Sequence, residues 1–198
     1  MKLKKLRDLF FFVALLTIFS NKLYANPQEF ISQLTSDASK ILASSQSKED
    51  KMIALIDLAE QNVDIEGIGM YTLGKHRKSL NEKQTEEYKL LFRKYFLKSF
   101  ASRLSEYTDP KITVLSEEVI NNKYTIVFSK LEADEKRPEI KIDWRVYTID
   151  PEKPLVRDLI IEGLSLARTQ REEFNSVIQN WEGKIDVLFS NLRNFIEK

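Results

Sequence analysis

The chain has 198 residues, with 31 Lys and Arg against 30 Asp and Glu, one His and no Cys. Without Cys, disulfide and thiol chemistry are excluded, and a single His leaves almost no ligands for a zinc site. A formal net charge of +1 is unlike the basic footprint of a nucleic-acid-binding protein, and 42% hydrophobic residues indicate a folded chain.

The first 25 residues predict a cleavable signal peptide and therefore an exported protein. Four cations within residues 1–7 precede an apolar segment over 9–19, and Ala25 is a small residue at the expected cleavage position. A membrane anchor is the alternative, but these 11 residues are fewer than the roughly 20 that span a bilayer. The first 25 residues hold five basic residues and one acidic residue, so residues 26–198 keep 26 cations and 29 anions, a net charge of −3. We expect 26–198 to form a single periplasmic domain.

Apolar residues recur at helical spacing before residue 108. This spacing predicts helices over 27–43, from 48 onward, over 65–73 and over 82–107. Ser47 and Asp64 stand at N-cap positions, and Gly74 ends the third helix. The longest helix carries a stripe at four-residue intervals, formed by Tyr88, Phe92, Phe96, Phe100 and Leu104. Such a stripe is typical of core packing, but its four rings leave gaps that small side chains or an apolar guest must fill.

After residue 110 the apolar residues alternate, which predicts strands. Four strands are expected, over 111–120, 123–132, 139–149 and 155–162, followed by helices over 169–181 and 184–197. Asn121 and Asn122 suit a tight turn, and short connections favour antiparallel neighbours with one dry face. The predicted fold class is therefore α+β, an antiparallel four-stranded meander sheet with helices before and after it packed on one face. The two layers are expected to enclose an apolar pocket.

Residues 163–167 nearly match the nucleophile elbow of a hydrolase, with Ser165 at the nucleophile position. That interpretation needs a His base after the serine, whereas the single His, His76, precedes it. The alternative is that Ser165 caps the helix after the last strand. The five Gly never take the spacing of a phosphate-binding loop. We predict no enzyme, no cofactor and no metal site, and keep hydrolysis by Ser165 as a rival hypothesis.

A short basic segment follows Gly74. His76 lies among Lys75, Arg77 and Lys78, and an exposed polar loop is the simplest interpretation. The alternative is that the three cations form a rim that contacts a phosphate or an acidic partner.

Three stretches of the chain carry motifs in a fixed order. Val63-Asp64, Ile68-Gly69 and Leu73-Gly74 follow the pattern V-D-x-x-x-I-G-x-x-x-L-G, and the aromatic stripe of the long helix comes next. Residues 158–166 then read D-L-I-I-E-G-L-S-L, followed by Arg171 and Phe174. Together these stretches resemble the MlaC family of periplasmic phospholipid-binding proteins, also described as toluene-tolerance or ABC-transporter auxiliary components. The chain departs from the family pattern at Arg77 and at Pro154 or Leu155, where Trp is common.

The resemblance implies a carrier that supports outer-membrane lipid asymmetry, and we expect it to be a monomer. Its implied partners are phospholipid, an inner-membrane ABC transporter with an MCE-domain subunit, and an outer-membrane lipoprotein–porin complex. The acyl chains would lie in the apolar pocket, with the head group near solvent and Lys75, Arg77 and Lys78 as candidates to contact it or a partner. The residues expected to line the pocket are Phe92, Phe96, Phe100, Ile126, Phe128, Ile142, Trp144, Val146, Ile160 and Leu164.

Two alternatives stay open. Each expected lining residue could be an ordinary core residue. The same groove could also serve a periplasmic chaperone or adaptor that binds apolar protein segments. An enclosed pocket would favour lipid, whereas an open groove with an exposed strand edge would favour a peptide.

Overall fold

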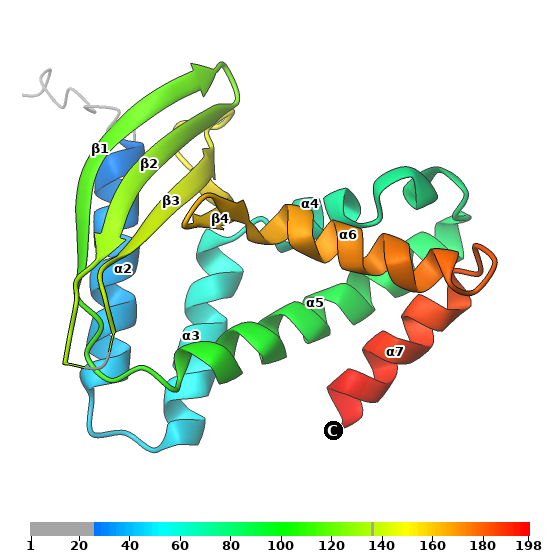
Figure 1. Cartoon of the computed structure of the whole chain (residues 1–198), viewed down its shortest axis with the longest axis horizontal. Coiled ribbons are helices and arrows are strands. Elements are labelled where there is room, and N and C mark those ends of the chain that lie inside the picture. Colours follow the sequence, from blue (N-terminus) through cyan, green and yellow to red (C-terminus); the bar gives the residue numbers. More distant parts are fainter. Residues whose placement is uncertain (1–25, 136) are drawn as a thin grey trace, which may run out of the picture.

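A computed structural model of the protein describes residues 26–135 and 137–198, so the predicted signal peptide lies outside the described residues. Before the sheet come helices α2 (Pro27–Ala43), α3 (Lys48–Asn62), α4 (Ile65–Thr72), the 3₁₀ helix η1 (Gly74–Lys78) and α5 (Glu82–Leu104). Helices α6 (Leu166–Gln179) and α7 (Asp186–Glu197) follow it. In Figure 1 the sheet and α2 form one end of the molecule, α4, α6 and α7 form the other, and α5 runs between them. None of the described helices is long and apolar enough to cross a membrane.

The sheet is an antiparallel meander with strand order β1-β2-β3-β4-β5. Its strands are β1 (Ile112–Asn121), β2 (Tyr124–Leu131), β3 (Ile140–Tyr147), β4 (Leu155–Ile161) and β5 (Leu164–Ser165). The predicted α+β class and meander are confirmed, and the two-residue β5 is an addition. Because Ser165 ends β5 and caps α6, that helix begins at Leu166 and not at residue 169.

Local capping explains where the helices begin. Ser47 accepts the backbone N–H of Asp50, and Asp64 accepts that of Gly67, as predicted. Asn81 and Gln84 form a reciprocal capping box at the start of α5. The helix ends at Leu104, three residues earlier than its apolar spacing predicts, because the chain turns there toward β1.

One face of the sheet is dry and packs against α2. The opposite face, which we call the outer face, carries Ile126, Asp143 and Asp158, which are also buried. On the dry face Val127, Val146 and Val156 are buried against Ile31 of α2. The register places Trp144 opposite Val127, and therefore on this same face. Helix α2 packs mainly on β1 and β2 and covers Val146 and Val156, so the end of the dry face where Ile142 pairs with Ile161 lies beyond it.

The second core lies among the helices. Tyr88 and Phe92 of α5 are buried with Phe174 of α6 and Phe189 of α7. The Tyr88 hydroxyl lies 2.8 Å from Thr72 Oγ1 and donates to the carbonyl oxygen of Gly69 at 3.1 Å. Burial is the main reason that the pKa of Tyr88 is raised above its ordinary value. Part of the aromatic stripe of α5 is therefore ordinary core.

Candidate functional site

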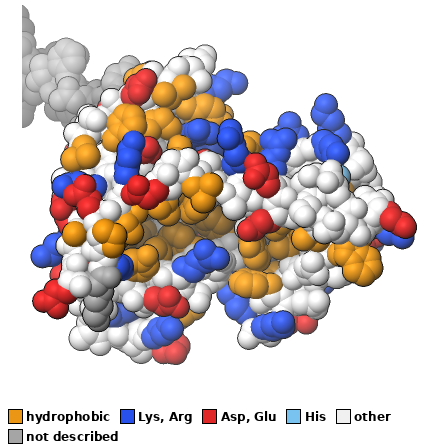
Figure 2. Space-filling view, in the orientation of Figure 1, with side chains coloured by type: hydrophobic (Ala, Val, Ile, Leu, Met, Phe, Trp, Pro, Cys, Tyr) orange, Lys and Arg blue, Asp and Glu red, His pale blue; other side chains and the backbone are white. Residues whose placement is uncertain are grey.

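The uncovered part of the dry face is an apolar wall. Ile142 and Trp144 of β3 and Leu159 and Ile161 of β4 share this face, and all four are half-buried. In Figure 2 apolar side chains gather in a hollow between the strands and α5. The wall thus lies where an apolar ligand can reach it from the surface.

Trp144 is held in this wall by its neighbours. Its indole Nε1 donates a hydrogen bond of 2.9 Å to Oγ of Ser129, which is buried in β2. The Ser129 hydroxyl in turn donates to the carbonyl oxygen of Ile142 at 2.8 Å. Because the single polar atom of the indole is satisfied from within the sheet, the ring offers only apolar surface to the hollow.

Helix α5 provides the opposite wall. Phe96 and Phe100 are half-buried and stacked, with ring centroids 5.9 Å apart and an interplanar angle of 10°. Phe100 also packs with Leu55 of α3 and Ala101. The helix packs mainly on α3, α4 and α7, and the hollow lies between it and the strands.

Comparison with known proteins identifies the family. The family model described as MlaC protein matches residues 28–194. The chain belongs to the MlaC family. Its structure is similar to that of the phospholipid-binding protein from Ralstonia solanacearum in complex with a phospholipid at 1.53 Å. The TM-score is 0.72 at 17% sequence identity, over 87% of this chain and 98% of that one, which shows that the two share a fold. Curated protein sequences contain no match.

In the structure of this MlaC-family chain, four of the expected lining residues are half-buried on elements that border the hollow. Ile142 and Trp144 belong to the sheet wall, and Phe96 and Phe100 to the helix wall. Val146 is on the same face but fully buried beside α2. Phe92 is buried in the helical core, edge-on to Phe174 with centroids 6.3 Å apart.

The other four sheet residues do not join this wall. Ile126 and Phe128 pair with Arg145 and Asp143, and Ile160 also pairs with Asp143, so all three side chains are on the outer face. The alternation of strand β2 does not reveal this, because apolar residues occur on both of its faces. Leu164 pairs with Ile161 at the end of the sheet and is 58% exposed. The hollow is open on the face in Figure 2, where the sequence predicts an enclosed pocket.

Sequence reasoning missed Leu159 and Ile161. They belong to the run Leu159-Ile160-Ile161, in which every residue is apolar and the face is ambiguous. Asp158 is the signal that could have resolved it. Because side chains alternate, the polar Asp158 and Ile160 share one face, and Leu159 and Ile161 share the other.

Ser165 is part of a helix cap in this MlaC-family fold. Its hydroxyl donates to Oδ2 of the buried Asp158 at 2.6 Å and accepts the backbone N–H of Arg168 at 3.1 Å. The other carboxylate oxygen of Asp158 accepts the backbone N–H of Ala167 at 2.9 Å. The predicted cap is confirmed. His76, the base that a hydrolase would need, belongs to η1, and its Nε2 lies 3.1 Å from Oδ1 of Asn175 in α6.

The Val63-Asp64 motif joins the two halves of the molecule. The backbone N–H of Asp64 donates to the carbonyl oxygen of Val156 at 2.9 Å, and its carboxylate forms an ion pair with Arg157 of β4. A Cβ at Gly67 would lie 2.5 Å from the Arg157 guanidinium carbon, so a side chain at this position would displace the Arg157–Asp64 ion pair. The motif therefore fixes α4 to the sheet.

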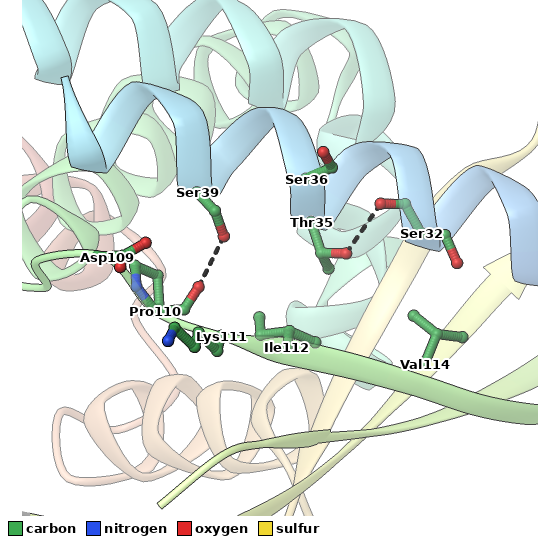
Figure 3. Close-up of a pocket in the computed structure, with 9 residues that line it drawn as sticks. All are labelled: Ser32, Thr35, Ser36, Ser39, Asp109, Pro110, Lys111, Ile112 and Val114. Atoms are coloured by element: carbon green, nitrogen blue, oxygen red, sulfur yellow. Dashed lines mark hydrogen bonds between the residues drawn. The ribbon is translucent and has the colours of Figure 1, made fainter. Parts of the chain in front are cut away.

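A separate pocket of about 380 Å³ lies between α2 and the start of β1 (Figure 3). Serine and threonine side chains of α2 face the pocket, and Ser39 donates to the carbonyl oxygen of Pro110 at 2.7 Å. With hydroxyl groups along one wall, this pocket is a poorer match for acyl chains than the apolar hollow.

Proposed function

We propose that this protein is a phospholipid carrier that holds acyl chains in the apolar hollow. The observation that carries the proposal is the apolar hollow, bordered by the half-buried wall of Ile142, Trp144, Leu159 and Ile161 and by α5, where Phe96 and Phe100 are stacked and half-buried. Membership of the MlaC family and a fold shared with a phospholipid-binding protein support it. Unlike Val127 and Val146, which are fully buried, these side chains keep part of their surface exposed.

We further propose that the carrier works in the periplasm as a monomer between two membrane complexes. These are an inner-membrane ABC transporter with an MCE-domain subunit and an outer-membrane lipoprotein–porin complex. Burial stabilises a lipid by about 0.8 kcal/mol per methylene, so two chains represent on the order of 20 kcal/mol before opposing costs. Escape into water would be very slow. Release must therefore be coupled to docking, with the chains passing directly between apolar sites.

Native mass spectrometry tests the cargo. Residues 26–198 would be exported in a Gram-negative host, purified without detergent and sprayed from a volatile buffer. We expect a population heavier by one phospholipid, whose mass identifies the lipid. An unchanged apo mass, even after incubation with liposomes, would contradict the proposal.

A matched pair of variants locates the site. Leu159→Trp fills the hollow without adding charge and should lower the lipid-bound fraction. Val119→Trp makes the same kind of change at a side chain that is 70% exposed in β1, and should leave that fraction unchanged. Equal occupancy in both variants would place the lipid elsewhere.

A chaperone or adaptor that binds apolar protein segments is the second candidate. The open hollow and the exposed edge strand β1 favour it, because an extended peptide can pair with a free edge. The same mass spectra separate the two functions. Bound peptides would give many heterogeneous masses, whereas phospholipids give a narrow family that differs in acyl length.

We propose a binding protein and not an enzyme. Ser165→Ala removes the hydroxyl that a lipid hydrolase would need. We expect the bound lipid and its intact mass to be the same in this variant and the wild type, with a stability loss of about 1 kcal/mol from the lost cap. The control is Ser47→Ala, which removes a cap far from the hollow. Lysolipid in the wild type that disappears in Ser165→Ala would favour hydrolysis.

A further inference from the structure

We propose that a basic patch on η1 and α6 is a docking surface for a protein partner that presents clustered carboxylates. The patch consists of Lys75, Arg77 and Lys78 of η1 together with Arg168 and Arg171 of α6. All five side chains are exposed, and none forms an ion pair with another residue of 26–135 or 137–198. In Figure 2 blue Lys and Arg side chains gather around the pale blue His on the upper right of the molecule.

The fold holds the two halves of the patch together. The Arg171 guanidinium lies over the ring of Tyr71, 5.2 Å from its centroid. Arg171 Nε is 2.9 Å from the position that a Cβ of Gly74 would take, and His76 is hydrogen-bonded to Asn175. These contacts fix η1 against α6, so the cations are presented by packed segments. Glu172 and Glu173 of α6 are close to Arg168 and Arg171 in the chain but form no ion pair with the patch, so the five cations stay in excess. Like charges gathered in this way disfavour folding, which is accounted for if a partner supplies further negative charge.

The surroundings of the patch favour a protein over a membrane. A peripheral membrane site combines cations with apolar side chains that insert between lipids. Among the described residues of η1 no large apolar side chain is exposed, and on α6 the exposed Leu166 belongs to the flank that faces α5. Arginine also suits carboxylates, because its planar fork can bind both oxygens at once.

The patch and the contact of α6 with α5 lie on different flanks of α6. Gln170, on one flank of α6, accepts a hydrogen bond of 2.8 Å from Tyr95 of α5, whereas Arg171 is on the other flank against Tyr71. The cations of the patch are therefore on a different flank of α6 from the residue that contacts α5. A partner docked on the patch would sit beside the start of α6, next to the hollow.

Charge reversal tests the patch in residues 26–198. The patch variant carries Lys75→Glu, Arg77→Glu and Lys78→Glu. The control variant carries Lys48→Glu, Lys94→Glu and Lys123→Glu, three exposed lysines without ion pairs on other elements, so both variants change the net charge equally. Binding of fluorescently labelled poly-L-glutamate would be followed by anisotropy at low and high salt. We expect the patch variant to bind about tenfold or more weakly than the control variant, with a difference that shrinks in salt.

Two results would overturn the proposal. Equal affinity of the two variants for poly-L-glutamate would show that net charge, and not the patch, governs binding. Patch-dependent co-sedimentation with phosphatidylcholine vesicles containing phosphatidylglycerol would assign the surface to a membrane. Circular dichroism and the lipid content of the patch variant would be measured in parallel. The docking surface does not depend on the cargo. A wild type that carries no lipid would therefore contradict the proposed function and leave the docking proposal standing.

Discussion

The buried side chain of Tyr88 makes the stability of the protein depend on pH. Burial raises the pKa of its phenol above the ordinary value near 10, so the folded state keeps the neutral form while the unfolded state ionises. This stabilisation is complete below about pH 10 and decreases as the pH rises further. We expect Tyr88→Phe to lower the free energy of unfolding by about 1 kcal/mol at pH 7, because its hydrogen bonds are lost.

The pH dependence of the free energy of unfolding distinguishes the effect of the raised pKa of Tyr88 from that of its hydrogen bonds. The stability difference between the wild type and Tyr88→Phe should narrow above pH 10, as measured by urea unfolding. Tyr95→Phe is the control, since burial also raises the pKa of Tyr95 but its side chain is only half-buried. Parallel curves for wild type and Tyr88→Phe above pH 10 would contradict this account.

Gly74 allows both a backbone conformation and a close contact. Its φ is +55°, and a Cβ there would crowd Arg171 at 2.9 Å. We expect Gly74→Ala to cost more than the roughly 1–2 kcal/mol of a left-handed alanine, because the arginine must also move. Gly163→Ala is the matched control, with φ +81° and open space around its Cβ. Thermal unfolding compares the two, and equal losses would mean that the Arg171 contact is unimportant.

At the scale of elements, α5 divides into a core segment and a segment beside the hollow. Phe92 is 2% exposed, whereas Phe96 and Phe100 are half-buried. Phe92→Ala should destabilise the protein by about 3–5 kcal/mol, as expected for a fully buried ring. Phe96→Ala should cost less stability but lower the lipid-bound fraction. Unfolding in urea and native mass spectrometry measure the two effects, and equal stability losses would contradict this division of the helix.

At the scale of the whole molecule, the hollow makes stability depend on cargo. A ligand at a hundredfold excess over its Kd adds about 2.7 kcal/mol to a folded protein. For a chain of this size that corresponds to a Tm increase of roughly 5–10 °C. We expect extraction of the lipid to lower the Tm by this amount and re-addition of phospholipid to restore it. Scanning calorimetry before and after extraction is the measurement, and an unchanged Tm would indicate that the hollow needs no occupant.

The sequence by itself determined the local features of this protein. Ser47, Asp64 and Ser165 cap their helices as predicted, because a cap depends on bonds between residues two or three positions apart. The meander also follows from the sequence, since short connections force successive strands to pair. The family motifs led to the MlaC family, which the family model confirmed.

Only the tertiary structure decided which side chains face the hollow. Strand β2 is apolar on both faces, so pairing with Arg145 and Asp143 was needed to place Ile126 and Phe128 on the outer face. Whether each aromatic ring on α5 is buried depends on where α4, α6 and α7 pack, which the local spacing of residues does not reveal. The basic patch joins segments about a hundred residues apart in the chain. Local bonds can be read along the chain, but burial and proximity are properties of how the elements pack together.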